Sequence, residues 1–159
     1  MTREQFISLV ESSQKAFRRF LVALCCGDSC LADDIAQESY IKAYLSCDDL
    51  KDSEKFNSWI NRIGYTTFLN HKRSEKINAG YDEVLYVPAA DRADRAFDNQ
   101  ELYKALNQLP AKERTSLLLY YMENYSIKEI AVIQDTSESA IKQHLLRGRN
   151  HLRGLLSND

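Results

Sequence analysis

The sequence lacks the features that would mark it as a membrane protein or an enzyme. No stretch approaches the roughly 20 apolar residues of a membrane-spanning helix, and the five glycines form no phosphate-binding loop. The three histidines lie on basic segments rather than beside a nucleophile or a carboxylate. We therefore predict a non-enzyme with no catalytic residue and no membrane insertion of its own.

A paired zinc-binding motif is also missing. The four cysteines, Cys25, Cys26, Cys30 and Cys47, are irregularly spaced and have no histidine nearby. We interpret them as free core or incidental thiols and predict no metal and no cofactor. The apolar run from Phe20 to Cys26 is too short, and too far into the chain, for a signal peptide. A cytoplasmic protein with reduced cysteines is the expectation.

The net charge of −2 is too small for a protein that coats nucleic acid by bulk attraction, but the charge is uneven. Residues 28–54 carry eight acidic against two basic side chains, whereas residues 57–76 carry four basic against one acidic. Residues 137–159 again carry four basic side chains, against two acidic ones. The pattern predicts two separate phosphate contacts and an acidic surface for another partner.

The stretch from Ser126 to Arg153 is typical of a helix-turn-helix. Ser126 and Glu129 form a capping-box pair that begins one helix, Asp135 suits the left-handed turn after it, and Ser137 caps the next helix. The second helix has an inward apolar stripe and an opposite basic side, which suits a DNA major groove. An ordinary solvated helical hairpin is the alternative interpretation of these residues alone.

Two helices in the first half also have distinctive faces. The helix predicted from Leu31 to about Ser46 has a polar side with one apolar residue, which suits a contact site or a solvated acidic surface. We call this side the acidic face: Asp34, Gln37, Glu38 and Ile41. The helix that begins at Phe56 mixes amide, aromatic, hydroxyl and basic groups on one side, which suits unstacked bases and phosphates. We call it the base-binding face: Asn61, Arg62, Tyr65, Thr66, Asn70 and Arg73.

Helical periodicity lapses between these blocks, and strand-like alternation is limited to residues 83–87. The predicted fold is all-α, with two small helical domains at 1–76 and 98–159 joined by a linker at 77–97.

The blocks resemble the extracytoplasmic-function sigma factors. Residues 33–44 and 56–63 are similar to the first conserved domain of that family, and residues 109–110, 126–131 and 141–153 to the second. The resemblance implies a factor that binds core RNA polymerase and promoter DNA, and it allows for an anti-sigma factor as a further partner. The sequence departs from the family pattern at Thr66, where asparagine is usual, and at Gly148, where alanine is usual.

The resemblance also implies roles for the faces. The acidic face would contact the polymerase, and residues 47–55 with the base-binding face would open and hold the −10 element. A recognition face in the second domain would contact the −35 element: Ser139, Lys142, Gln143, Leu146 and Arg147. We assign phosphate contacts to Lys128, His144, Arg149 and Arg153.

Two alternatives stay open at this point. A stand-alone helix-turn-helix regulator would bind duplex DNA unaided, usually as a dimer. A helical redox or metal sensor would act through its cysteines instead, and metal content or thiol-dependent association would identify it.

Overall fold

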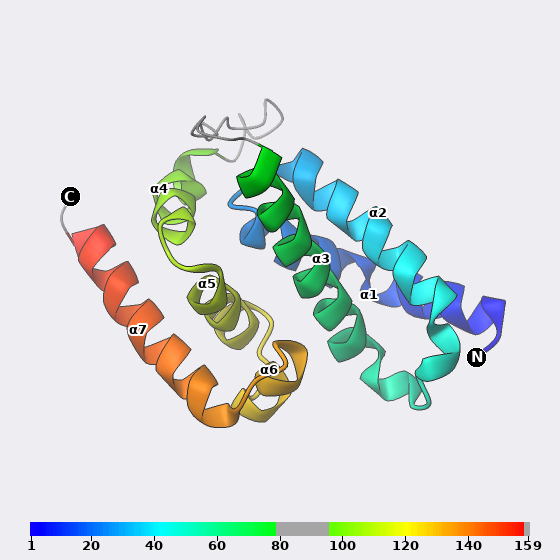
Figure 1. The fold of residues 1–159 in the computed structure, drawn as a ribbon. Coiled ribbons are helices and arrows are strands. Elements are labelled where there is room, and N and C mark those ends of the chain that lie inside the picture. Colours follow the sequence, from blue (N-terminus) through cyan, green and yellow to red (C-terminus); the bar gives the residue numbers. More distant parts are fainter. Residues whose placement is uncertain (79–95, 158–159) are drawn as a thin grey trace.

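The computed structural model describes residues 1–78 and 96–157, and all the regular secondary structure in that part is helical (Figure 1). The predicted all-α class is confirmed. The helices are α1 (Arg3–Leu24), α2 (Ser29–Leu45), α3 (Phe56–Asn78), α4 (Ala96–Asn107), α5 (Ala111–Leu117), α6 (Ile127–Ile133) and α7 (Glu138–Ser157). Short helical turns are η1 (Cys47–Asp49), η2 (Ser53–Lys55) and the π-helical η4 (Leu118–Met122). The predicted strand-like residues 83–87 lie outside the described residues.

Helices α3 and α4 reach slightly into the segment 77–97 that the sequence predicts as a linker, since α3 ends at Asn78 and α4 begins at Ala96. No helix within the described ranges is long and apolar enough to cross a membrane.

The N-terminal half packs α1, α2 and α3 around one apolar core. Thr2 and Gln5 form a capping box at the start of α1, and Phe17, Phe20 and Leu24 are buried on its inner side. The chain turns after α1 through Cys26 and Gly27, which have φ values of 53° and 90°. Asp28 then caps α2 by accepting from Leu31 N, so α2 begins earlier than the periodicity predicts.

Helices α1 and α3 approach closely at Gly64. A Cβ atom at this position would lie 2.7 Å from Cε1 of the buried Phe17 ring and 3.4 Å from Leu21 Cδ2. Glycine is therefore needed here for close helix packing rather than for an unusual φ.

The C-terminal half is built around α5, in which every residue from Glu113 to Leu117 is buried. Pro110 is the N-cap of α5, just ahead of its first turn. A Cβ at Gly148 would lie 2.9 Å from Leu117 Cδ1, so the glycine lets α7 lie close against α5. This contact accounts for the departure from alanine that the sequence shows at Gly148.

The helix-turn-helix is formed as predicted by α6 and α7. Ser126 and Glu129 make the capping box of α6, Asp135 is left-handed with φ 53°, and Ser137 Oγ accepts from Ala140 N. Ile130, Ile133 and Ile141 are buried between the two helices and the rest of the half.

The two halves pack directly against each other. Helix α6 lies beside the first turns of α3 (Figure 1), and η4 contacts α1. Arg114 of α5 is buried and donates to the carbonyl oxygens of Leu106 and Leu109 in its own half, at 2.8 and 3.2 Å, and of Leu24 in α1, at 2.9 Å. Its guanidinium also lies 5.9 Å from the centre of the Phe68 ring of α3. The sequence predicts two separate domains joined by a linker, and it does not predict this contact between them.

We expect Gly64→Ala to lower the free energy of unfolding by about 1–3 kcal/mol, because overpacking against the Phe17 ring outweighs the gain in helix propensity. Gly154→Ala is the matched control, since a Cβ there meets nothing within 4 Å, and we expect it to raise stability by up to about 1 kcal/mol. Urea unfolding followed by circular dichroism measures both. Equal effects of the two substitutions would contradict the close approach of α1 and α3.

Candidate nucleic-acid interface

The recognition face occupies the first half of α7 and is open to solvent. Ser139, Lys142, Gln143, Leu146 and Arg147 are all exposed. Ile141 and Leu145 are buried on the opposite side of the same turns. The packing therefore fixes the rotation of α7 and turns two cations, an amide and an apolar side chain outward together, a set that suits the base edges of a major groove.

The residues predicted to contact phosphates are divided between different sites. Lys128 is exposed on α6. His144 faces α5, where Ser116 Oγ lies 3.4 Å from its Nδ1, and burial together with nearby Lys112 lowers the pKa of its imidazole. In the free protein, His144 therefore stays neutral to lower pH than an ordinary histidine.

Arg149 and Arg153 border an apolar groove of about 650 Å³ that the sequence does not predict. Arg149 donates to Tyr121 Oη at 3.1 Å. The groove lies between α4, α5, η4 and the second half of α7, and its apolar residues are Leu102, Leu106, Leu117, Leu118, Tyr121, Met122, Leu152 and Leu156. Leu102 and Tyr121 recur with other apolar residues at the spacing typical of a packed helix side. The periodicity therefore does not predict that they stay partly exposed.

Part of the base-binding face borders a hollow of about 310 Å³ between α2 and α3. Arg62 and Thr66 line it together with Lys42, Ser46, Trp59, Ile63 and Thr67. Lys42 Nζ donates to Thr67 Oγ1 at 3.1 Å, which brings a cation to its wall. An indole, hydroxyls and cations together suit a flat ring with a neighbouring phosphate, and Lys42 and Trp59 are residues that the sequence did not include in this face.

The rest of the face divides in two. Thr66, Asn70 and Arg73 are exposed, whereas Asn61 and Tyr65 are buried. The sequence predicts that all five residues lie on an exposed polar side, because helical periodicity reveals only the main apolar stripe of a helix. The structure differs because α3 packs on two sides, against α1 and α2 and against α6.

The acidic face lies on α2, a helix that α3 separates from the C-terminal half (Figure 1). Asp34, Gln37 and Ile41 are exposed, and Ile41 is 57% exposed although it is apolar. Glu38 is held in place, with Oε2 2.7 Å from His71 Nε2 of α3 and Oε1 3.6 Å from Lys42 Nζ. The hydrogen bond from His71 lowers the pKa of Glu38 most, and the charge of Lys42 adds to the effect.

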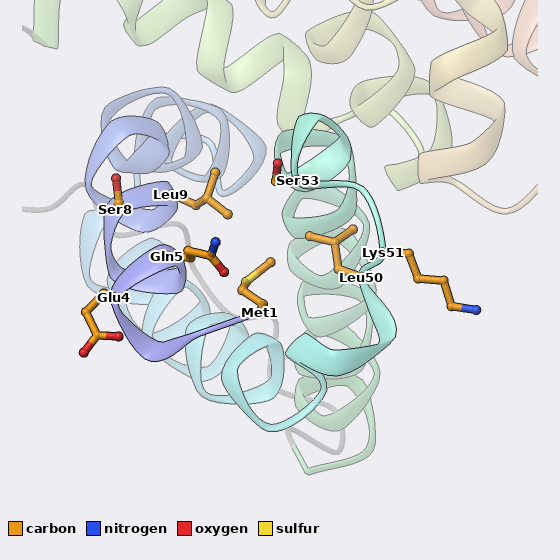
Figure 2. A pocket seen from close by; sticks show the side chains of 8 residues that line it. All are labelled: Met1, Glu4, Gln5, Ser8, Leu9, Leu50, Lys51 and Ser53. Atoms are coloured by element: carbon orange, nitrogen blue, oxygen red, sulfur yellow. The ribbon is translucent and has the colours of Figure 1, made fainter.

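A second hollow, of about 560 Å³, separates the start of α1 from residues 50–53 (Figure 2). Met1, Leu9 and Leu50 point into it, while the charged ends of Glu4 and Lys51 point away. It brings no set of catalytic groups together. Its apolar residues, Met1, Leu9 and Leu50, pack against the hydrophobic core.

The cysteines lie in different environments. Cys25 and Cys26 are buried, Cys47 is partly buried and Cys30 is exposed. Burial raises the pKa of Cys25 to about 12, so its reactive thiolate is scarce at neutral pH. Among residues 1–78 and 96–157, no three histidine, cysteine or acidic side chains are grouped so that they could hold a metal ion.

Comparisons with known proteins match both halves. The model of sigma-70 region 2 matches residues 9–77, and the model of sigma-70 region 4 matches residues 99–152. The ECF RNA polymerase sigma factors SigW and SigM of Bacillus subtilis are 31% and 28% identical to the chain. SigW aligns over 77% of this chain and 73% of its own length, and SigM over 86% of each.

Two solved structures share the whole fold. The sigma factor RpoE of Bartonella quintana, in complex with the anti-sigma factor NepR, superposes with a TM-score of 0.79 at 25% identity and covers 97% of this chain and 98% of its own. CnrH, in complex with the cytosolic domain of CnrY, superposes with a TM-score of 0.75 at 21% identity and covers 99% of this chain and 91% of its own.

We expect His71→Ala to raise the pKa of Glu38 toward the ordinary glutamate value, because the largest cause of its lowering is lost. A lowered folded-state pKa means that Glu38 stabilises the fold above its unfolded pKa and that this contribution disappears as pH falls through the folded pKa. The stability difference between the wild type and His71→Ala should therefore shrink in acid. Carboxyl NMR titration and urea unfolding over a pH series measure both effects, and an unmoved Glu38 titration would contradict the pairing.

Proposed function

The chain belongs to the ECF group of RNA polymerase sigma factors, which direct the polymerase to promoters, and we propose how its parts divide this task. Residues 1–76 contact core polymerase and the −10 element, residues 77–97 link the domains, and residues 98–159 contact the −35 element. The observation that carries this division is the outward recognition face of α7, which is held in position by the buried side of the same helix.

At the −35 element, Lys142 and Arg147 donate to guanine N7 and O6, and Gln143 contacts an adenine edge. Leu146, 50% exposed between them, suits the apolar methyl group of a thymine, and Ser139 lies at the start of the same face. Lys128 and His144 flank the recognition face and contact phosphates. Arg149 and Arg153 lie farther along α7, beside the apolar groove, and make weaker phosphate contacts.

At the −10 element, the hollow between α2 and α3 holds an unstacked base. Trp59 supplies a ring for stacking, Thr66 supplies a hydroxyl for the base edge, and Arg62 and Lys42 neutralise the neighbouring phosphates. Asn61 and Tyr65 lie one turn apart on the side of α3 that faces α6, and they join the site once that side is free. Asn70 and Arg73 extend the contact toward the end of α3.

Core polymerase contacts the acidic face of α2. Asp34 and Gln37 are exposed acceptors, Glu38 is kept ionised by His71, and Ile41 adds an apolar contact. A charged face with one exposed apolar residue suits a complementary basic surface. Because its polymerase works in the cytoplasm, we propose that this protein is cytoplasmic as well.

An anti-sigma protein is a further proposed partner. The support is the similarity to RpoE of Bartonella quintana, whose structure contains the anti-sigma factor NepR. Co-purification of a tagged chain from its own cells, with and without added core polymerase, tests for such a partner.

We expect Arg147→Ala to relax base preference at particular −35 positions by about 1–3 kcal/mol, because a bidentate contact to a guanine is lost. Arg153→Ala is the matched control on the same helix and should weaken all promoters alike or leave them unchanged. Transcription by reconstituted holoenzyme on a promoter library randomised at the −35 element measures both. An unaltered preference in Arg147→Ala would remove α7 from the role of recognition helix.

We expect the double reversal Asp34→Lys with Glu38→Lys to weaken core binding while the fold stays intact, because it brings like charges together at the contact. Glu4→Lys with Glu11→Lys is the control of equal charge change, at exposed positions on α1. A pull-down with core polymerase compares them, and circular dichroism checks folding because the reversal also removes the His71 pair. Equal core affinity of the two double variants would count against the acidic face.

A further inference from the structure

We propose that Glu38 is a positioning residue of the −10 site, because it holds the ammonium group of Lys42 at the wall of the hollow between α2 and α3. This inference rests on the proposed function of that hollow, in which Lys42 neutralises a phosphate of the −10 strand. It gives Glu38 a second task beside its place in the acidic face. One carboxylate thus serves both the polymerase contact and the −10 contact.

The ammonium group of Lys42 lies between partners on two helices. Its Nζ donates to Thr67 Oγ1 of α3 at 3.1 Å and lies 3.6 Å from Glu38 Oε1, one turn earlier in α2. Thr67 is fully buried, and its hydroxyl proton is donated to the carbonyl oxygen of Ile63 at 2.8 Å. Since a hydroxyl has only one proton, Thr67 can only accept from Lys42, which fixes the direction of this bond.

Glu38 is itself held from α3. Its other carboxylate oxygen, Oε2, lies 2.7 Å from His71 Nε2, so both oxygens have a partner. A chain of polar contacts therefore runs from His71 to Glu38, on to Lys42 and then to Thr67. Because a lysine side chain loses much conformational freedom when it is fixed, a lysine that is already held in place loses less when it binds a phosphate.

The carboxylate of Glu38 has two opposite effects on a phosphate in the hollow, since it holds Lys42 and also repels the phosphate. An ammonium group has three N–H donors, and among the described residues Thr67 takes one and Glu38 at most another, which leaves a third for the strand. Lys42 lines the hollow, whereas Glu38 lies outside the set of described residues that line it. The Glu38 side chain is 45% exposed, so solvent screens its repulsion. The hold on Lys42 therefore outweighs the repulsion.

Two substitutions of Glu38 separate its position from its charge. Glu38→Ala and Glu38→Gln remove the same negative charge, so simple electrostatics predicts that both bind DNA equally and more tightly than the wild type. If Glu38 positions Lys42, Glu38→Ala binds more weakly and Glu38→Gln stays close to the wild type, because the amide oxygen can still accept from Lys42. Asp33→Ala is the matched control, since Asp33 is another α2 carboxylate in a surface ion pair, but its partner is Arg18 of α1.

Fluorescence anisotropy measures the affinity of reconstituted holoenzyme for a fork-junction DNA whose single-stranded part carries a −10 sequence selected from a random library. Core polymerase is kept at a saturating concentration for each variant, so a change in core affinity does not enter. We expect Lys42→Ala to bind about tenfold more weakly than the wild type, Glu38→Ala about twofold more weakly, and Asp33→Ala no more weakly. Adding Glu38→Ala to Lys42→Ala should cause no further loss, because Glu38 acts through Lys42.

The order of the Lys42 ammonium group in the free protein is a second measurement, and it needs neither DNA nor polymerase. Nitrogen-15 NMR relaxation of Nζ reports how tightly this group is held on the picosecond-to-nanosecond timescale. We expect its order parameter to fall in Glu38→Ala and to stay at the wild-type value in Asp33→Ala. Circular dichroism confirms that each variant is folded.

Equal DNA affinity of Glu38→Ala and Glu38→Gln would overturn the proposal, as would an unchanged order parameter of Lys42 Nζ in Glu38→Ala. A further loss of affinity in the double variant would overturn it as well, since Glu38 would then act without Lys42. The proposed function is tested separately by Lys42→Ala and Thr66→Ala. If both of these holoenzymes bind the fork-junction DNA as the wild type does, the hollow is not the −10 site, whatever the NMR relaxation shows.

Discussion

The arrangement of the whole molecule depends on one buried cation. Within the part of the chain that the structure describes, Arg114 donates to no carboxylate. It donates instead to main-chain oxygens of Leu106 and Asn107 at the end of α4, of Leu109 just before α5, and of Leu24 at the end of α1. The carbonyls of Leu24 and Asn107 belong to the last residues of α1 and α4, where the negative end of the helix dipole lies. A planar guanidinium with five donors can serve all four acceptors at once, whereas a lysine ammonium has only three donors. The start of α5 is thereby fixed to its own half and to the other half together.

The same constraint decides which surfaces are open. With α5 held at the junction, α6 lies against α3, and the polar side of α3 that faces α6 becomes an internal contact. The recognition face of α7 and the acidic face of α2 stay on outer surfaces. In this form the proposed polymerase and −35 contacts are largely exposed, whereas Asn61 and Tyr65 of the proposed −10 site are buried.

Much of the local structure could be predicted because it depends on neighbours in sequence. The capping box at Ser126, the left-handed Asp135 and the cap at Ser137 are each fixed by residues within one helical turn. The recognition face follows from a single apolar stripe in α7. The sequence did not predict the burial of side chains on a second packed side of a helix. Tyr65 is an example: it lies off the apolar stripe of α3, yet it is buried. The apolar groove beside Arg149 was not predicted either. The spacing of its leucines is typical of core residues, and their exposure depends on how α4 packs against α7.

The sequence by itself determined the helices, their caps, the turn of the helix-turn-helix and the membership of the sigma family, because each is written in short-range periodicity and in residue types at fixed spacing. Only the tertiary structure decided that the halves close on each other, that Arg19 reaches Glu123, and that Asn61 and Tyr65 are covered. These contacts join residues far apart in the chain. The free energy of such a contact depends on burial and on the direction of each donor, and neither is encoded in the local pattern that fixes a helix.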